Sequence, residues 1–287
     1  MNVQRLLTHD FPVIEQSYDA RFTSLYALTA GYGQDPLDED QLQYVYGGNP
    51  KTTGSMALVL ANPGFWQQEA WTGIDWVRCV LGEQRLTVHK PFPPSGHLIS
   101  QLRVTDVVDK GKRFGALLYS QRTLSDAITG EHYATLSMMS ICRGDGGSGR
   151  QSSTSTALPV PPDRPHDFQC EMPTLYQHAL LFDLHGIVNP IHSLPAIALK
   201  AGYPKPILHG ICSFGLVHHG LVRQLGAYDA DVIQDMAIRF RGPVYPGETL
   251  QVSAWLSDDR NVIFEVYAKE RRVLAMHGIA ELVTARD

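Results

Sequence analysis

Two polar residues, Asn189 and His192, stand on either side of Pro190 and could carry proton chemistry. A histidine with an ordinary pKa near 6.5 can take up and release a proton at neutral pH. Because proline ends a preceding helix, the residues just before it are expected to form an irregular turn. Asp183 and His185 are the other titratable groups nearby. The residues alone leave open a second interpretation, in which this turn only satisfies backbone groups.

Three further patterns could carry chemistry, but each has a simpler explanation. Cys212 lies in an apolar segment with nothing nearby that clearly lowers its pKa, which favours core packing over nucleophilic catalysis. His218 and His219 are adjacent and point to different helix faces, so no metal site is predicted. Residues 144–149 fit G-x-G-x-x-G, but Ser, Thr and Pro follow instead of a helix, which predicts a loop after a strand.

The elements that must position these residues repeat along the chain. Apolar residues at three- and four-residue spacing predict a buried helix over 211–225, which ends at Gly226. A helix followed by antiparallel strands predicts an α+β fold with the sheet wrapped on the helix. Alternating patterns predict strands over 98–108, 113–123, 133–142, 250–256, 262–267 and 273–283.

The two halves of the chain are similar in sequence. Pro91 and Pro243, Pro94 and Pro246, and Leu98 and Leu250 are each 152 positions apart. Between the halves, residues 143–165 change from Gly- and Ser-rich to Pro-rich, which is typical of a linker. We therefore predict a duplicated domain, with an N-terminal half over 1–150, a linker over 151–168 and a C-terminal half over 169–287.

The composition excludes several classes of function. The 287 residues carry a net charge of −5, so the chain lacks the excess of positive charge that is typical of nucleic-acid-binding proteins. No apolar run approaches the ~18 residues of a membrane span, and the N-terminus lacks a signal-peptide core. The four cysteines form no C-x-x-C pair, and residues 285–287 do not resemble a peroxisomal signal. We expect a cytoplasmic protein with unpaired thiols and no nucleic-acid or membrane partner.

Several motifs in order resemble the MaoC-like hydratase 2 family. They are residues 26–28, 81–96, 144–147, 182–192, 198, 202–203, 206–210, 239–240 and 243–250. The resemblance implies a double hotdog: two hotdog repeats, each an antiparallel sheet wrapped round a central helix, in a protein that forms a homodimer. It also implies reversible addition of water to a trans-2-enoyl-CoA, giving the (3R)-3-hydroxyacyl-CoA. The coenzyme A thioester is the substrate, and no cofactor or metal is implied.

The family motif G-D-x-N-P-[LIV]-H gives these residues roles. His192 matches the histidine that deprotonates water, Asn189 matches the asparagine, and the backbone N–H of Gly210 is implied to bind the thioester carbonyl. Ile187 occupies the position of the family aspartate, and an isoleucine can neither accept a proton nor bind water. The resemblance implies substrate or CoA contacts from Lys90, Gly186, Ile187, Val188, Pro190, Ile191 and Phe240.

The departures from this motif leave three hypotheses open. His185 replaces a small residue of the family motif, and His185 and Asp183 are candidate substitute bases. The first hypothesis is a hydratase or dehydratase that uses His192. The second is another acyl-thioester enzyme, an isomerase or a thioesterase, and the third is a non-catalytic acyl-CoA binder. In each, the first half supplies the acyl-chain and CoA-binding part of the site.

Overall fold

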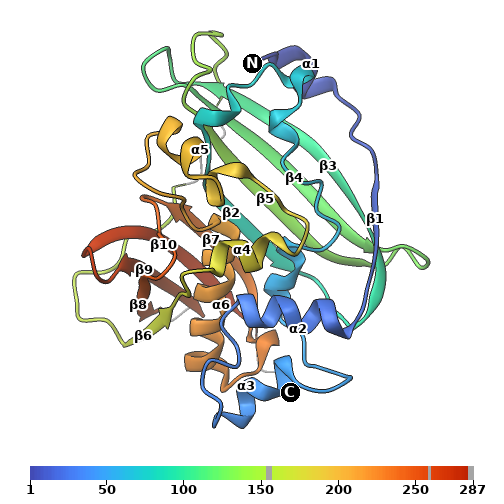
Figure 1. Cartoon of the computed structure of the whole chain (residues 1–287), viewed down its shortest axis with the longest axis vertical. Helices are drawn as coiled ribbons and strands as arrows, with labels where there is room; N and C mark the ends of the chain where they lie inside the picture. Colours follow the sequence, from blue (N-terminus) through green and yellow to red (C-terminus); the bar gives the residue numbers. More distant parts are fainter. Residues whose placement is uncertain (153–156, 258–259, 284–287) are drawn as a thin grey trace.

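A single ten-stranded antiparallel sheet runs through the molecule. The computed structural model describes residues 1–152, 157–257 and 260–283. The strand order is β1-β3-β4-β5-β2-β7-β10-β9-β8-β6 (Figure 1). The strands are β1 Ile14–Tyr18, β2 Cys79–Val88, β3 Gly96–Asp109, β4 Ala116–Asp126, β5 His132–Cys142, β6 Phe168–Pro173, β7 Ile233–Phe240, β8 Thr249–Leu256, β9 Asn261–Ala268 and β10 Val273–Leu282.

This order confirms the predicted double hotdog. Read outward from the centre, β2-β5-β4-β3-β1 mirrors β7-β10-β9-β8-β6, as expected for a duplicated unit. Five of the six predicted strands lie within about two residues of the observed ones. The strand predicted over 113–123 begins later, at Ala116, because residues 110–115 form a turn in which Gly115 has a φ of +86°. Strands β1, β2, β6 and β7 were not predicted.

The two halves join through strands β2 and β7. Arg85 pairs with Asp235 at 3.0 Å, and the hydroxyl of Thr87 donates to the same carboxylate at 2.6 Å. Arg239 forms an ion pair with Glu83 at the other end of this seam. Backbone pairing and these side-chain contacts make the two sheets continuous.

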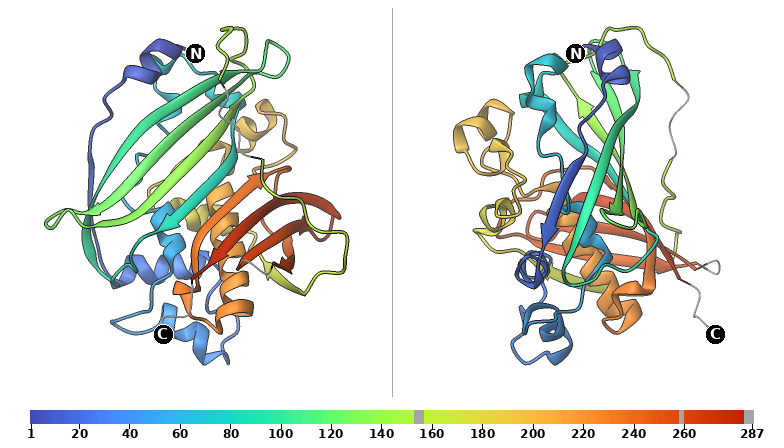
Figure 2. Two further views of the ribbon diagram at one scale, coloured as in Figure 1. Left: turned by 180° about the vertical axis from the view of Figure 1, so that it is seen from behind. Right: turned by 90° about the vertical axis from the view of Figure 1, so that its right-hand side faces the viewer.

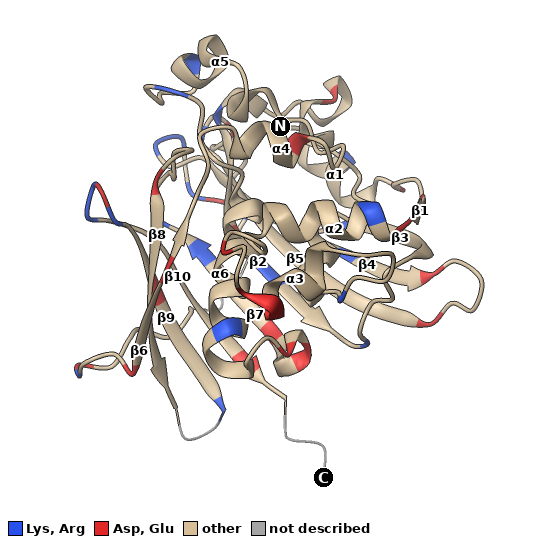
Figure 3. Ribbon diagram, turned by 60° about the horizontal axis from the view of Figure 1, so that its bottom comes forward, with Lys and Arg blue, Asp and Glu red and all other residues tan. Residues whose placement is uncertain are grey.

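Helix α6, Gly210–Gly226, is the central helix of the C-terminal half and confirms the helix predicted over 211–225. It is buried along eleven consecutive residues, 212–222, and contacts β6, β7 and β8. Its charged residue, Arg223, lies in the last turn (Figure 3). None of the described helices is long and apolar enough to cross a membrane.

The N-terminal half is built differently, because its sheet is covered by short segments. A 3₁₀ turn, η1 (Gly54–Leu58), lies against β2 and β5. The buried guanidinium of Arg122, on β4, holds this region by donating to the carbonyls of Ala57 (2.9 Å), Leu58 (3.3 Å), Leu60 (2.5 Å) and Ala61 (3.3 Å). Among the described residues, no helix covers the outer face of these strands (Figure 2). The other helices are α1 Val3–Thr8, α2 Ala20–Thr29, α3 Glu39–Val45, α4 His178–Asp183 and α5 Pro195–Lys200, with 3₁₀ turns η2 Trp66–Gln68, η3 Ala70–Thr72, η4 Trp76–Arg78, η5 Pro190–His192 and η6 Ala230–Val232.

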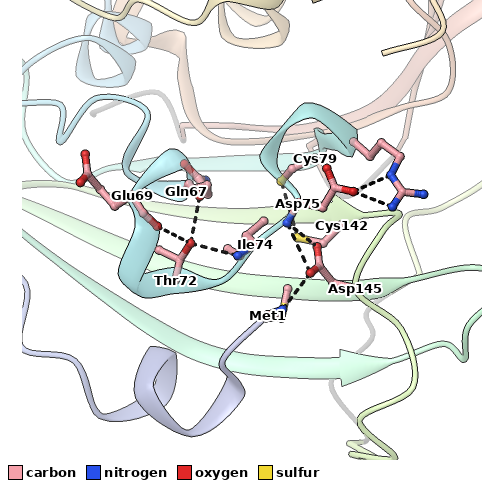
Figure 4. A network of polar contacts seen from close by, with 10 residues as sticks. Met1, Gln67, Glu69, Thr72, Ile74, Asp75, Cys79, Cys142 and Asp145 are labelled. Atoms are coloured by element: carbon pink, nitrogen blue, oxygen red, sulfur yellow. Dashed lines mark hydrogen bonds and ion pairs between the residues drawn. The ribbon is translucent and has the colours of Figure 1, made fainter. Parts of the chain in front are cut away.

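The glycine-rich run after β5 is a loop, as predicted. The carboxylate of Asp109 accepts hydrogen bonds from the N–H groups of Gly147 (2.9 Å) and Gly149 (2.6 Å), and no helix follows. Beside it, Asp145 accepts from the backbone N–H of Asp75 at 3.2 Å and pairs with the amino group of Met1 (Figure 4). The linker prediction falls partly on residues 153–156, which lie outside the described part of the chain.

The four cysteines are unpaired, as predicted. Cys79 and Cys142 are register partners on β2 and β5, and their Sγ atoms lie 3.5 Å apart (Figure 4). Both thiols are buried. The pair closes one end of the N-terminal sheet.

Candidate functional site

A cavity of about 350 Å³ lies where the two halves meet; we call it the junction cavity. The C-terminal half contributes η5, the loop before α6 and the first turn of α6. The N-terminal half contributes the inner faces of β2, β4 and β5 together with the loop around Phe65 and Trp66. Its lining is mainly apolar with a small number of polar groups, as in ligand-binding cavities generally.

His192 lies in the wall of this cavity, at the end of η5. The turn begins at Asn189, whose side-chain oxygen accepts from the N–H of Ile191 at 3.2 Å, with Pro190 at the first helical position. The Nδ1–H of His192 donates to the carbonyl of Ile207 at 2.8 Å. Since a carbonyl can only accept, the other ring nitrogen, Nε2, is left unprotonated in the neutral ring. His192 therefore presents a proton acceptor on the cavity side.

Burial keeps this imidazole neutral. Desolvation lowers the pKa of His192 well below its usual range, nearby His209 lowers it further, and the bond to Ile207 opposes both. A base with a low pKa is weak but remains deprotonated at neutral and mildly acidic pH.

His209 supports His192 from behind. The two rings are tilted by 31° with their centroids 3.7 Å apart. Nε2 of His209 lies 3.1 Å from Oδ1 of Asp183, although the two do not form a well-aligned hydrogen bond. Burial lowers the pKa of His209, and the Asp183 carboxylate opposes this. The other oxygen of Asp183 accepts from the hydroxyl of Ser193 at 2.5 Å, which ties α4 to the residue after His192.

Ile187, which the motif resemblance aligns with the family aspartate, lines the junction cavity. It is only 9% exposed and packs into the main hydrophobic core. None of the described residues that line the cavity is an aspartate or a glutamate. Catalysis in this cavity must therefore rely on imidazole, amide, hydroxyl and backbone groups.

Gly210 is the first residue of α6 and also lines the cavity. The N–H groups of a first helical turn have no partner within the helix, and the helix dipole makes this end positive. A Cβ at this position would come within 2.8 Å of Leu81 and 3.2 Å of Phe240. Glycine thus keeps the space in front of these N–H groups open.

The remaining predicted residues divide into two groups. Ile191 and Phe240 line the cavity with Asn189, whereas Gly186, Val188 and Pro190 do not. Lys90 lies outside the cavity, where its exposed ammonium pairs with Glu131.

Neither candidate substitute base reaches the cavity wall. His185 is buried against Phe22, Tyr26 and Phe182, and its Nδ1–H donates to the Phe182 carbonyl at 2.9 Å. Burial lowers the pKa of His185 to about 4. Asp183 acts on His209 and Ser193 instead of on the cavity.

Comparison with known proteins agrees with this geometry. Residues 16–144 match the MFE-2 hydratase 2 N-terminal domain, and residues 157–277 match the MaoC like domain. The chain is 36% identical to enoyl-CoA hydratase ChsH3 of Mycobacterium tuberculosis over 96% of both sequences. It is 30% identical to the peroxisomal enoyl-CoA hydratase 2 of Arabidopsis thaliana, over 98% of this chain and 95% of that one. A MaoC-like dehydratase from Phytophthora capsici superposes over the full length of both chains, with a TM-score of 0.83 and 27% identity.

The chain belongs to the MaoC-like hydratase 2 family of hydro-lyases. The family resemblance in the sequence is thereby confirmed, while the individual site roles stay predictions.

Several residues that line the junction cavity of this hydratase 2 family member were not predicted from the sequence. His209 immediately precedes Gly210, and its position in the loop before α6 was the available signal. Phe65 and Trp66 carry no motif, because their place in the wall depends on how the loop before β2 folds. Two exposed arginines, Arg143 and Arg241, also border the cavity.

Proposed function

We propose that this protein adds water reversibly to trans-2-enoyl-CoA esters to give (3R)-3-hydroxyacyl-CoA, with His192 as its acid–base group. The observation that carries the proposal is the bond from His192 to the Ile207 carbonyl, which leaves Nε2 free in the same cavity as Gly210. The names of the relatives support the reaction and the thioester substrate.

In the proposed reaction, His192 transfers one proton from water to C2 of the substrate. Nε2 of His192 accepts a proton from water while the water oxygen bonds to C3 of the substrate. The electrons of the C2–C3 double bond then shift towards the thioester oxygen, where the N–H of Gly210 and the α6 dipole stabilise the negative charge. His192 returns the proton to C2, so water is added across the double bond. Asn189 has its amide N–H₂ available to orient the water, since its oxygen caps η5.

The coenzyme A part would lie at the mouth of the cavity. Arg143 and Arg241 are exposed there, and guanidinium groups suit phosphates. Lys90, the CoA contact implied by the family, lies away from the cavity and is paired with Glu131.

The test is the loss of enoyl-thioester absorbance on hydration, measured for the protein and for His192→Ala and Ile187→Asp. We expect the unmodified protein to hydrate the substrate and His192→Ala to lose about 10²–10⁴ in rate. Ile187→Asp, which adds a second water-binding group, is expected to be faster. Unchanged activity in His192→Ala would overturn the proposal. Activity in Ile187→Asp alone would make the parent an acyl-CoA binder.

A second candidate function, double-bond isomerisation, is favoured by the absence of a carboxylate among the described residues that line the cavity. Moving the double bond of a 3-enoyl thioester from C3–C4 to C2–C3 needs one base, which takes a proton from C2 and returns it to C4. Incubation with a 3-enoyl-CoA separates the two reactions. An isomerase accumulates the 2-enoyl thioester, whereas a hydratase alone leaves the 3-enoyl substrate unchanged.

We also propose a cytoplasmic homodimer. The proposal is supported by the sequence features given above and by the pairing common among hotdog sheets. Light scattering on the purified protein tests the assembly, and fractionation of the source cells tests the location. Several relatives are named as peroxisomal, so an organelle is the alternative result.

A further inference from the structure

The N-terminal wall of the junction cavity carries polar side chains at positions where a strand facing a core normally carries apolar ones. Gln84 on β2, Ser120 on β4 and Ser140 on β5 each line the cavity and are each 3% exposed. Arg122, two residues along β4 from Ser120, lines it as well and is 6% exposed. We call these four residues the polar strip. An inner sheet face that held only an alkyl chain would be expected to be apolar throughout.

Most of the strip's hydrogen-bonding capacity is not used within the described part of the protein. The hydroxyls of Ser120 and Ser140 have no partner there. Gln84 donates to the carbonyls of Arg85 (2.8 Å) and Ser137 (3.2 Å), which leaves its side-chain oxygen free. A buried polar group without a partner costs roughly 1–3 kcal/mol. None of these three oxygens is among the fully buried unpaired atoms of the described residues, so each faces the cavity and meets whatever fills it, water or a ligand.

Both terminal nitrogens of the Arg122 guanidinium already have hydrogen-bond partners. Four carbonyl oxygens at the end of η1 accept from its two terminal nitrogens, and no carboxylate is among these partners. The strip as a whole thus offers hydroxyls, one amide oxygen and one remaining Arg122 N–H, at Nε, which match a neutral oxygen group better than a carboxylate.

The strip lies along the direction that an acyl chain would take from Gly210. Leu81 lies against Gly210, and Ser140 is its register partner on the neighbouring strand. Ser120 is one strand further out, on β4, since Met138 pairs with both Gln84 and Ser120. With strands about 4.8 Å apart, these hydroxyls lie about one and two strand spacings from β2.

We infer that the polar strip recognises a neutral oxygen substituent, a hydroxyl or a keto group, on the distal part of the acyl chain. The inference rests on the proposed function, because it takes the thioester carbonyl to be held at Gly210. It names an oxygenated enoyl-CoA as the preferred substrate class.

The experiment compares hydration of matched trans-2-enoyl-CoA esters of eight and twelve carbons that end in a methyl, a hydroxymethyl or a carboxylate group. The variant is the double replacement Ser120→Ala with Ser140→Ala. The control is Ser137→Ala, since Ser137 alternates with the strip along β5 and does not line the cavity. We expect the hydroxymethyl ester to have the highest kcat/KM. The double variant should lower the ratio of hydroxymethyl to methyl activity by about threefold to tenfold for each lost hydrogen bond.

The methyl esters separate this inference from the proposed function. If no ester is hydrated by any form, the proposed function fails first. If methyl esters are hydrated as well as or better than hydroxymethyl esters, the inference is overturned while hydration stands. A preference for the carboxylate ester would overturn the assignment to a neutral group. An unchanged ratio of hydroxymethyl to methyl activity in the double variant would overturn the inference, because Ser120 and Ser140 would then not bind the substituent.

Discussion

His192 combines two features that usually conflict in a proton acceptor: it is partly buried, and yet one ring nitrogen is left free. The Ile207 carbonyl fixes the tautomer, and burial together with the adjacent His209 lowers the pKa of His192. The motif resemblance predicts that Ile187 stands at the position of the family aspartate.

The first prediction concerns the pH dependence of activity. The base works only when it is unprotonated, so activity is lost as the pH falls through the pKa of His192. Because that pKa lies well below 6.5, kcat/KM for enoyl-CoA hydration should stay level from pH 7.5 down through 6.5 and decline only at lower pH. A decline centred near 6.5 would indicate a solvated histidine as the base and contradict the geometry.

The second prediction separates support from catalysis at Asp183. Asp183→Asn keeps the hydrogen bond with Ser193 possible but removes the negative charge next to His209. Because Asp183 does not line the cavity, we expect kcat to fall by less than about tenfold. A loss of 10²–10⁴ would instead identify Asp183 as the substitute base. Ser193→Ala is the complementary variant, since it removes the hydrogen bond with Asp183 and keeps the negative charge of Asp183.

For single residues, the sequence indicates which side chains could act in the site better than it indicates where those side chains lie in the fold. The His192 motif was visible, and Asn189, Gly210 and Phe240 all reach the cavity. The role of His209 was not predicted, because its contact with His192 depends on the path of the chain between η5 and α6. His185 is only seven residues from His192 in the sequence, yet its side chain is directed into the core.

Among the secondary-structure elements, α6 and five strands outside the β2–β7 seam are well encoded in the sequence, and the N-terminal covering segments are not. The apolar spacing of α6 and the alternation in β3, β5, β8, β9 and β10 made these elements predictable. Segment η1 is a 3₁₀ turn whose carbonyls of Ala57 and Leu58 accept from Arg122, 65 and 64 positions away in the sequence. Local propensity cannot predict such a distant contact. Strands β2 and β7 pair with each other across the seam, and neither was predicted.

The third prediction tests the packing of β10. A Cβ at Gly278 would lie 2.3 Å from the Ala237 carbonyl oxygen on β7 and 2.4 Å from the Phe264 ring on β9. Gly278→Ala should therefore lower the free energy of unfolding by roughly 1–3 kcal/mol or more. Gly48→Ala is the control, since a Cβ there has no neighbour within 4 Å. Urea unfolding measures both, and equal midpoints would contradict the close packing of the two strands.

Over the whole molecule, buried histidines link stability to pH. Burial is the main cause that lowers the pKa of His178, His185, His192, His209, His218 and His219. The folded protein keeps these rings neutral, whereas the unfolded chain protonates them below about 6.5. Stability is therefore lost as the pH falls below that value.

The fourth prediction follows from this linkage. Each ring that stays neutral costs up to about 1.4 kcal/mol for every pH unit below 6.5. We expect the free energy of unfolding to be level between pH 8 and 7 and to fall steeply between 6.5 and 5. The aspartates with lowered pKa contribute only near and below their ordinary value of 3.8, outside this window. His218→Gln should make the slope shallower by about one proton, and a flat profile down to pH 5 would contradict the burial of these rings.

The seam between β2 and β7 separates two parts of the proposed site. The reacting histidine belongs to the C-terminal half, and the polar strip belongs to the N-terminal half. An engineer could therefore exchange the N-terminal half for that of a relative and keep the pairing of Glu83 with Arg239 and of Arg85 with Asp235. Such a chimera would inherit its reaction from one parent and its choice of acyl chain from the other. Substrate range in this architecture could then diversify by recombination without touching the residues that move the proton.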